Sequence, residues 1–149
     1  MVIVEKITAI LQAMTDDPGC ELNSWQYNRL SKGNVRLDTK MPSPTALFVQ
    51  ISDWKLDMNR LAKRELAHIS VSFLNKTTKP MDGEGVDEDA IVTDMCEIAL
   101  DFIQRIRADR TIRIDNDVIN LKSVFYASDS NRVGVTVELD IEEVQGSCI

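Results

Sequence analysis

The segment from Asp87 to Asp109 constrains the fold more than any other stretch of the sequence. Its apolar residues recur at steps of three and four, which is the spacing of one face of an α-helix. Acidic residues crowd its start and arginines its end, which matches the positive and negative ends of a helix dipole. The positions on the apolar face are Ile91, Met95, Ile98, Phe102 and Ile106, with Val92, Ala99 and Ile103 widening it.

Length and charge limit the class of protein. A chain of 149 residues suits one domain, because a chain of about 150 residues buries roughly 70% of its unfolded surface on folding. The net charge of −7 argues against nucleic acid as a partner of the surface as a whole, since phosphate binding draws on clustered lysine and arginine. A local basic patch remains open.

The sequence shows no targeting or membrane-spanning pattern. The first residues lack a basic lead-in and are interrupted by Glu5 and Lys6, so they do not read as a secretory signal. No apolar run approaches the ~20 residues that span a bilayer. Cys20, Cys96 and Cys148 are odd in number and far apart, which predicts neither a disulfide framework nor a zinc site. A reducing compartment, the cytoplasm, is expected.

Two further elements precede the first strand pattern. Apolar spacing predicts a helix from Val2 to Met14, and the following Asp-Asp-Pro-Gly ends it. Residues 20–44 are expected to form a long connection in which Trp25, Tyr27 and Leu30 lie in a short strand or turn. Whether this connection is ordered stays open at this point, because long connections are either functional or disordered.

Alternation of apolar and polar residues predicts the strands. The residues from Trp54 to Arg64 form a wide hairpin loop, or the first strand continues to about Met58. Residues 75–86 are expected to form a second long connection, and residues 144–149 a frayed tail. The predicted strands are 45–53, 67–73, 111–114, 118–126 and 133–142.

This order predicts a two-layer α+β domain spanning residues 1–149. Two amphipathic helices on one face of an antiparallel or mixed sheet would cover all the apolar positions. The expected order is helix, strand, strand, helix, strand, strand, with a third strand in the last group as an alternative. Strand patterns determine faces and not neighbours, so the sheet order remains open.

No catalytic or metal-binding motif is present. His68 is the only histidine, and a histidine on the polar side of a strand, with no nucleophile motif elsewhere, is expected to face solvent. The acidic run from Asp82 to Asp89 places Val86 fifth and Asp87 sixth, which breaks the calcium-loop pattern. Cys96 is read as a small buried hydrophobe. We therefore predict no catalytic residue, cofactor or metal.

The predicted interface residues lie in the connections. Aromatic residues in loops often anchor interfaces, and a basic segment in an acidic protein suits an acidic partner, including another copy of the chain. The alternative for the basic segment is a solvated loop. The candidates are Trp25, Tyr27, Trp54, Arg60, Lys63 and Arg64.

The pattern as a whole resembles the small tail-terminator and tail-completion (neck) proteins of long-tailed bacteriophages and prophages. The resemblance is carried by the order of elements and by the long helix, which opens on Asp-Glu-Asp-Ala-Ile-Val-Thr-Asp-Met and closes on Phe-Ile-Gln-Arg-Ile. It implies a non-enzymatic virion assembly subunit that closes into a ring, commonly a hexamer, and docks on tail-tube or head-connector proteins. It also implies a cytoplasmic protein that becomes virion-associated.

An acidic channel lining would let DNA pass such a ring without sequence-specific binding. The residues predicted to supply it are Glu138, Asp140, Glu142 and Glu143. Two other functions stay open from the sequence. One is a small-ligand-binding domain or enzyme with an acidic pocket around His68, and the other is a generic intracellular protein-interaction module. Ring size and partner proteins are not encoded in any motif.

Overall fold

The structure, a computed structural model, has an α+β fold with two helices and one mixed sheet of six strands. It describes residues 2–29, 40–57, 62–76, 86–125 and 131–144. Neither described helix is long and apolar enough to cross a membrane. In chain order the elements are α1 (Val2–Asp16), β1 (Ser24–Arg29), β2 (Thr45–Asp57), β3 (Ala62–Lys76), α2 (Val86–Ala108), β4 (Ile112–Ile114), β5 (Leu121–Val124) and β6 (Arg132–Glu143).

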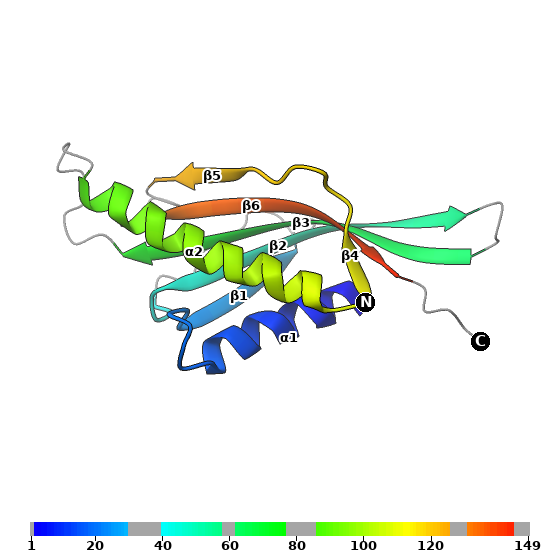
Figure 1. The fold of residues 1–149 in the computed structure, drawn as a ribbon, viewed down its shortest axis with the longest axis horizontal. Coiled ribbons are helices and arrows are strands. Elements are labelled where there is room, and N and C mark those ends of the chain that lie inside the picture. Colours follow the sequence, from blue (N-terminus) through cyan, green and yellow to red (C-terminus); the bar gives the residue numbers. More distant parts are fainter. Residues whose placement is uncertain (1, 30–39, 58–61, 77–85, 126–130, 145–149) are drawn as a thin grey trace.

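The sheet is built around β3 and β6. The strand order is β1-β2-β3-β6-β4, and β5 also pairs with β6. Only β1 runs parallel to its neighbour β2, and the other pairs are antiparallel. The last strand, β6, therefore has β3 along one edge and both β4 and β5 along the other (Figure 1).

Both helices lie on the same face of the sheet, with α2 running diagonally across the strands (Figure 1). The alternation of β3 places Ala67, Ile69, Val71 and Phe73 on this face, and all four are fully buried. Its counterpart in β6 is a row of buried aliphatic residues, which are Val133, Val135, Val137, Leu139 and Ile141. One hydrophobic core thus lies between the sheet and the helices.

The apolar face of α2 contacts the sheet as the spacing predicts. Met95, Ala99, Phe102 and Ile106 are fully buried, because residues three and four apart share one side of a helix. The Phe102 ring packs against Phe73 at a centroid distance of 5.4 Å and an interplanar angle of 60°. Such tilted pairs add stabilisation beyond the area that they bury.

The opposite face of the sheet carries a smaller apolar cluster. Leu47 and Leu74 are buried there beside the half-buried Val49 and Val124. Gly134 pairs in register with Leu74, and a Cβ added to Gly134 would lie 1.8 Å from the backbone oxygen of Phe73. Glycine is therefore required for β6 to approach β3 this closely.

Several boundaries differ from the sequence-based expectation. The predicted order contained too few strands, because the first connection includes the strand β1. The alternation around Trp25 and Tyr27 is too short to distinguish a strand from a turn. The alternative in which the first strand continues past Trp54 is confirmed, since β2 ends at Asp57. The strand β3 extends to Lys76, so the second connection is shorter than 75–86. Residues 118–120 lie outside β5, which begins at Leu121.

An arginine on α2 holds the turn after α1. The Arg105 guanidinium donates to Asp17 at 2.7 Å and to Asp101 at 3.0 Å. Asp17 also accepts a hydrogen bond from the N–H of Gly19. The Gly19 N–H and the Arg105 guanidinium together hold the pKa of Asp17 below its ordinary value. The turn that leads into β1 is thus tied to α2.

A second carboxylate fixes the turn from α2 into β4. One oxygen of Asp109 accepts from the Thr111 hydroxyl at 2.6 Å and from the Thr111 N–H at 2.9 Å. Lys6 of α1 lies 3.7 Å from the other oxygen. The Thr111 hydroxyl is the main cause that lowers the pKa of Asp109. This turn sets where β4 begins relative to the end of α2.

We predict that Phe102→Ala lowers the free energy of unfolding by about 3–5 kcal/mol, because the substitution leaves a cavity against Phe73. Chemical denaturation monitored by circular dichroism measures this change. Leu100→Ala is the matched control, since Leu100 is 45% exposed on the same helix. A Phe102→Ala protein as stable as the control would show that this face does not pack on the sheet.

We predict that Asp109→Asn lowers stability at pH 7 by about 0.5 kcal/mol, a modest effect because water screens a partly exposed carboxylate. The folded-state pKa of Asp109 is lowered, so its contribution is present above the unfolded pKa of about 3.9 and is lost as pH falls through the folded value. Denaturation at pH 7 and below pH 3 should show the difference from wild type disappearing in acid. A constant difference at both pH values would contradict the hydrogen-bonded carboxylate.

Candidate functional site

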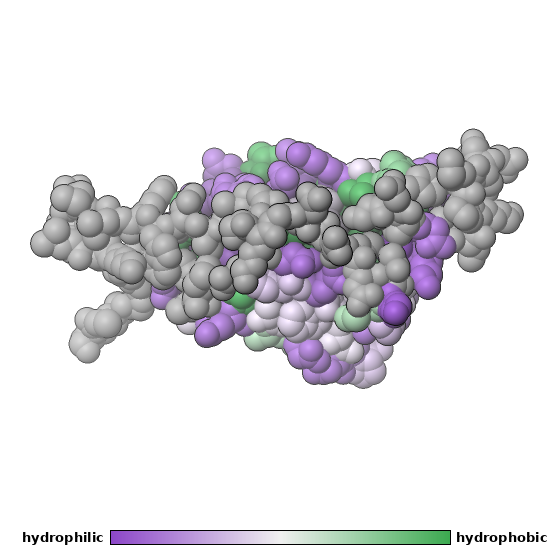
Figure 2. All heavy atoms as spheres, turned by 180° about the vertical axis from the view of Figure 1, so that it is seen from behind, coloured by the Kyte–Doolittle hydropathy of each residue, from purple (hydrophilic) through white to green (hydrophobic). Residues whose placement is uncertain are grey.

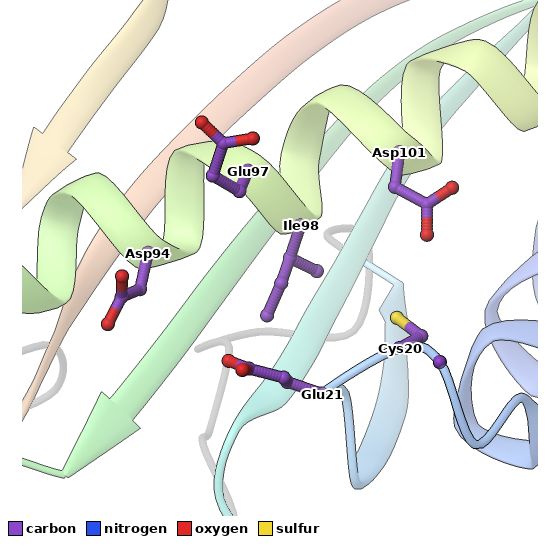
Figure 3. Close-up of a pocket in the computed structure, with 7 residues that line it drawn as sticks. Cys20, Glu21, Asp94, Glu97, Ile98 and Asp101 are labelled. Carbon is purple, nitrogen blue, oxygen red and sulfur yellow. The ribbon is translucent and has the colours of Figure 1, made fainter.

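Two concave surfaces border α2, one on each side of the face that packs on the sheet. The first, which we call the acidic cleft, has a volume of about 290 Å³ and lies between α2 and the connection from α1 to β1. Its lining residues are Gly19, Cys20, Glu21, Asp94, Glu97, Ile98 and Asp101. Figure 3 shows Ile98 and Asp101 directed toward the connection that carries Cys20 and Glu21, whereas Glu97 points away from it.

The chemistry available in the acidic cleft is limited. Burial is the main cause that raises the pKa of the Cys20 thiol, and Asp101 adds to it. A thiol in this environment stays protonated and is a poor nucleophile. Among the described residues, no group of three histidine, cysteine or carboxylate side chains is arranged to hold a metal ion. Asp101 is already bound to Arg105 at 3.0 Å.

His68 lies away from both concave surfaces, on the sheet face opposite the helices. Its Nδ1 is 2.7 Å from Asp140 across the β3–β6 pair, and both side chains are nearly half exposed. Ser70 and Ser72 continue the polar row along β3, with the Ser72 hydroxyl 2.6 Å from that of Thr136. In the part of the chain that the structure describes, the contact of the His68 ring is with Asp140 and not with a serine or cysteine nucleophile.

Three of the four predicted acidic channel residues share this face, and each is paired with a basic residue or with His68 on a neighbouring strand. Glu138 is 3.6 Å from Lys122, Asp140 is 2.7 Å from His68, and Glu142 is 2.6 Å from Arg113. Glu143 lies on the other face, because it is in register with the core residue Ile112. The row is therefore an alternation of both charges and not a uniform acidic surface, and the channel assignment stays a prediction.

Figure 2 views the molecule from the side opposite the helices. Hydrophilic residues predominate among the described part of this side, and small hydrophobic patches are scattered between them. The cross-strand contacts of Lys122 with Glu138, His68 with Asp140 and Arg113 with Glu142 agree with this mixed character. Charged pairs on a solvated sheet face contribute little to stability individually. Their arrangement therefore affects which partner this face can bind more than it affects the stability of the fold.

The predicted aromatic contacts have different positions in the fold. Trp25 and Tyr27 are half-buried and pack against the core. The Trp25 indole N–H donates to Gln12 on α1 at 2.9 Å, and the Tyr27 ring lies 4.9 Å from that of Phe48. These contacts give both residues a structural role in holding β1 under α1.

Three of the four remaining predicted interface residues belong to β2 or β3. Trp54 is in register with Glu65, and Arg64 with Lys55. Lys63 is in register with Leu56. Arg60 lies outside the residues that the structure describes. The structure thus brings Trp54, Lys63 and Arg64 into one hairpin.

The second concave surface, which we call the isoleucine groove, was not predicted from the sequence. It has a volume of about 460 Å³ and lies between the C-terminal part of α2, β4 and the loop after β4. Its lining residues are Ile103, Arg107, Ile112, Arg113, Ile114, Asn116, Asp117 and Ile119. The sequence contains one indication of this groove. Ile103 widens the apolar stripe of α2 beyond the face that the sheet covers, and Arg107 follows Ile103 by one helical turn.

Comparison with known proteins adds no family to these observations. No protein-family model matches the chain, and a search of curated proteins found no match either.

Proposed function

We propose that this chain is a non-enzymatic virion assembly subunit of a bacteriophage or prophage, a tail-terminator or head–tail joining protein that acts by self-association into a ring. The resemblance noted in the sequence supports this proposal through the long helix and the α+β class, whereas the observed order contains more strands than the expected one. The main structural support is the β2–β3 hairpin, which extends beyond the rest of the sheet (Figure 1).

The pairing registers define this hairpin arm. The last residue of β2 that pairs with β1 is Gln50, and the first residue of β3 that pairs with β6 is Leu66. The pairs from Trp54–Glu65 to Asp57–Ala62 therefore have no third strand among the described residues. At a rise of about 3.3 Å per residue, this part of the arm is roughly 13 Å long.

Such an arm is suited to contact another subunit. A two-stranded hairpin alone is marginally stable in water, and both of its outer edges present backbone groups that can pair with another chain. The arm projects from one end of the sheet (Figure 1), and in the proposed ring it contacts a different surface on the next copy. A contact between unlike surfaces is heterologous, and it generates a ring when the rotation closes.

A ring of this kind needs no active site. The polar, charge-paired sheet face and the shallow acidic cleft are compatible with docking to tail-tube or head-connector proteins. We propose no cofactor, no sequence-specific contact with DNA and no membrane contact. In this proposal the protein is made in the host cytoplasm and becomes part of the virion.

We predict that the full chain forms a discrete oligomer whose population increases with concentration from about 1 μM to about 1 mM, a range that covers contacts of moderate affinity. Native mass spectrometry and multi-angle light scattering measure its subunit number. A strictly monomeric protein throughout this range would contradict self-association.

The hairpin arm provides the matched test. Replacing residues 55–64 by Asn-Gly joins Trp54 to Glu65 through a two-residue turn that favours a hairpin. We expect this shortened protein to keep its core and its thermal unfolding transition, while its self-association weakens by at least about tenfold, as when the central contacts of an interface are removed. Assembly equal to that of wild type would show that the arm is not the contact.

A further inference from the structure

The isoleucine groove combines aliphatic and basic side chains in one concavity. Ile103 and Arg107 form the wall on α2, and β4 and the following loop form the other wall. Its volume of about 460 Å³ is within the range of protein clefts that hold ligands or short peptide segments. Four isoleucines give it an apolar floor, and they are Ile103, Ile112, Ile114 and Ile119.

The walls of the groove are held in place by hydrogen bonds. The side-chain oxygen of Asn116 accepts from the N–H of Asp140 at 2.7 Å, and the N–H of Asp115 donates to the Asp140 carbonyl at 2.8 Å. Asp109 fixes the turn before β4 through Thr111. The groove is therefore formed before any partner arrives, which lowers the entropic cost of binding.

The charges on the groove favour an anionic occupant. Arg107 is exposed, and Arg113 is 60% exposed while one of its nitrogens contacts Glu142. A guanidinium has five N–H donors, so Arg113 keeps donors for a second carboxylate. Asp117 is the single acidic residue in the lining, and Arg113 is balanced in part by Glu142, so Arg107 is the cation that the lining offers to an anionic partner.

The chain itself contains a segment of the complementary chemistry. Residues 81–89 hold carboxylates at Asp82, Glu84, Asp87, Glu88 and Asp89, together with the apolar Met81 and Val86. Glu88 is only 4% exposed in its own subunit, so the other four are the carboxylates offered to a partner. No lysine or arginine occurs between Lys79 and Arg105. We propose that the isoleucine groove of one subunit binds the acidic segment 81–89 of a second copy.

A subunit cannot fill its own groove with this segment. Arg107 lies 21 positions after Val86 within α2, which separates them by about 32 Å at 1.5 Å per residue. The five residue-to-residue steps from Met81 to Val86 span at most about 18 Å when fully extended. The segment and the groove are thus at opposite ends of α2, and only another chain can bring them together.

This contact is heterologous, like the one proposed for the hairpin arm, and it rests on the proposed ring. It assigns a charged surface to each side of a subunit: the groove with Arg107 on one side and the acidic start of α2 on the other. Complementary charges of this kind determine register and increase association rates, and their effect weakens with salt.

A peptide of residues 81–90 tests the groove without requiring assembly. We expect the fluorescently labelled peptide to bind the full chain saturably in an anisotropy titration at low salt. The Arg107→Glu protein should bind it at least about tenfold more weakly, because the substitution brings like charges together. Lys122→Glu, which makes the same charge change on the opposite sheet face, should bind it as wild type does.

A second peptide with the five carboxylates replaced by amides separates charge recognition from apolar contact. Weak or absent binding of the amide peptide supports the proposal. Equal binding of both peptides, or a lack of saturable binding of the acidic peptide, would overturn it. Equal binding by the Arg107→Glu and Lys122→Glu proteins would overturn it as well.

Charge exchange in the full chain tests the same contact during assembly. Arg107→Glu alone and the pair Asp82→Lys and Glu84→Lys should each weaken self-association, and combining all three should restore part of it. If the Arg107→Glu protein forms the same oligomer as wild type, the groove contact is refuted and the proposed ring is retained. A monomeric wild type whose groove still binds the acidic peptide through Arg107 would refute the ring and keep the groove.

Discussion

The packing of α2 across β3 and β6 is the interaction on which the rest of the structure depends. Phe102 and Phe73 lie at its centre, and the buried apolar residues of all three elements that face the helices belong to one core. Because α2 is clamped along this face, its two flanks have defined surroundings. One flank contributes Asp94 and Asp101 to the acidic cleft, and the other contributes Ile103 and Arg107 to the isoleucine groove. A single helix thus determines the core and both concave surfaces.

The two flanks of α2 differ in what they offer to a partner. The acidic cleft holds carboxylates that face water or Arg105, and its thiol is held in the protonated form. The isoleucine groove has an aliphatic floor whose burial would contribute free energy to an interface, roughly 25 cal/mol for each Å² removed from water. In the proposed contact, Arg107 at its rim would then select the charge of the partner. This combination of apolar floor and polar rim is the usual anatomy of a protein interface.

The sequence predicts the elements with strong periodicity and misses those that depend on distant neighbours. The stripe from Ile91 to Ile106 and the alternation of β6 give the α+β class correctly, because local period reports which faces are buried. The strand β1 has only Trp25 and Tyr27 as a signal, and it exists because β2 and α1 provide its pairing edge and its hydrogen-bond partner Gln12. Propensity in strands is largely a property of such neighbours.

The candidate site was less predictable than the fold for the same reason. His68 was expected on a polar strand face, and it lies there beside Asp140. The isoleucine groove is formed by a helix, a three-residue strand and a loop that meet only after folding. The pattern of a single segment therefore does not predict it. The register also separates Glu143 from the other acidic residues of β6. The alternation of β6 would place Glu143 on the face opposite to Glu142, provided that the strand is known to extend as far as Glu143.

The position of β6 has a consequence for how the protein is made. This strand is the neighbour of β3, β4 and β5, yet it comes after all of them in the chain. During synthesis β3 cannot pair with β6 until residues up to Glu143 have left the ribosome. Until then the edge of β3 that will pair with β6 is exposed to other chains. Pairing over such sequence separation is slow to form. A cell that produces many copies at once therefore has reason to keep nascent chains apart with chaperones until β6 has inserted.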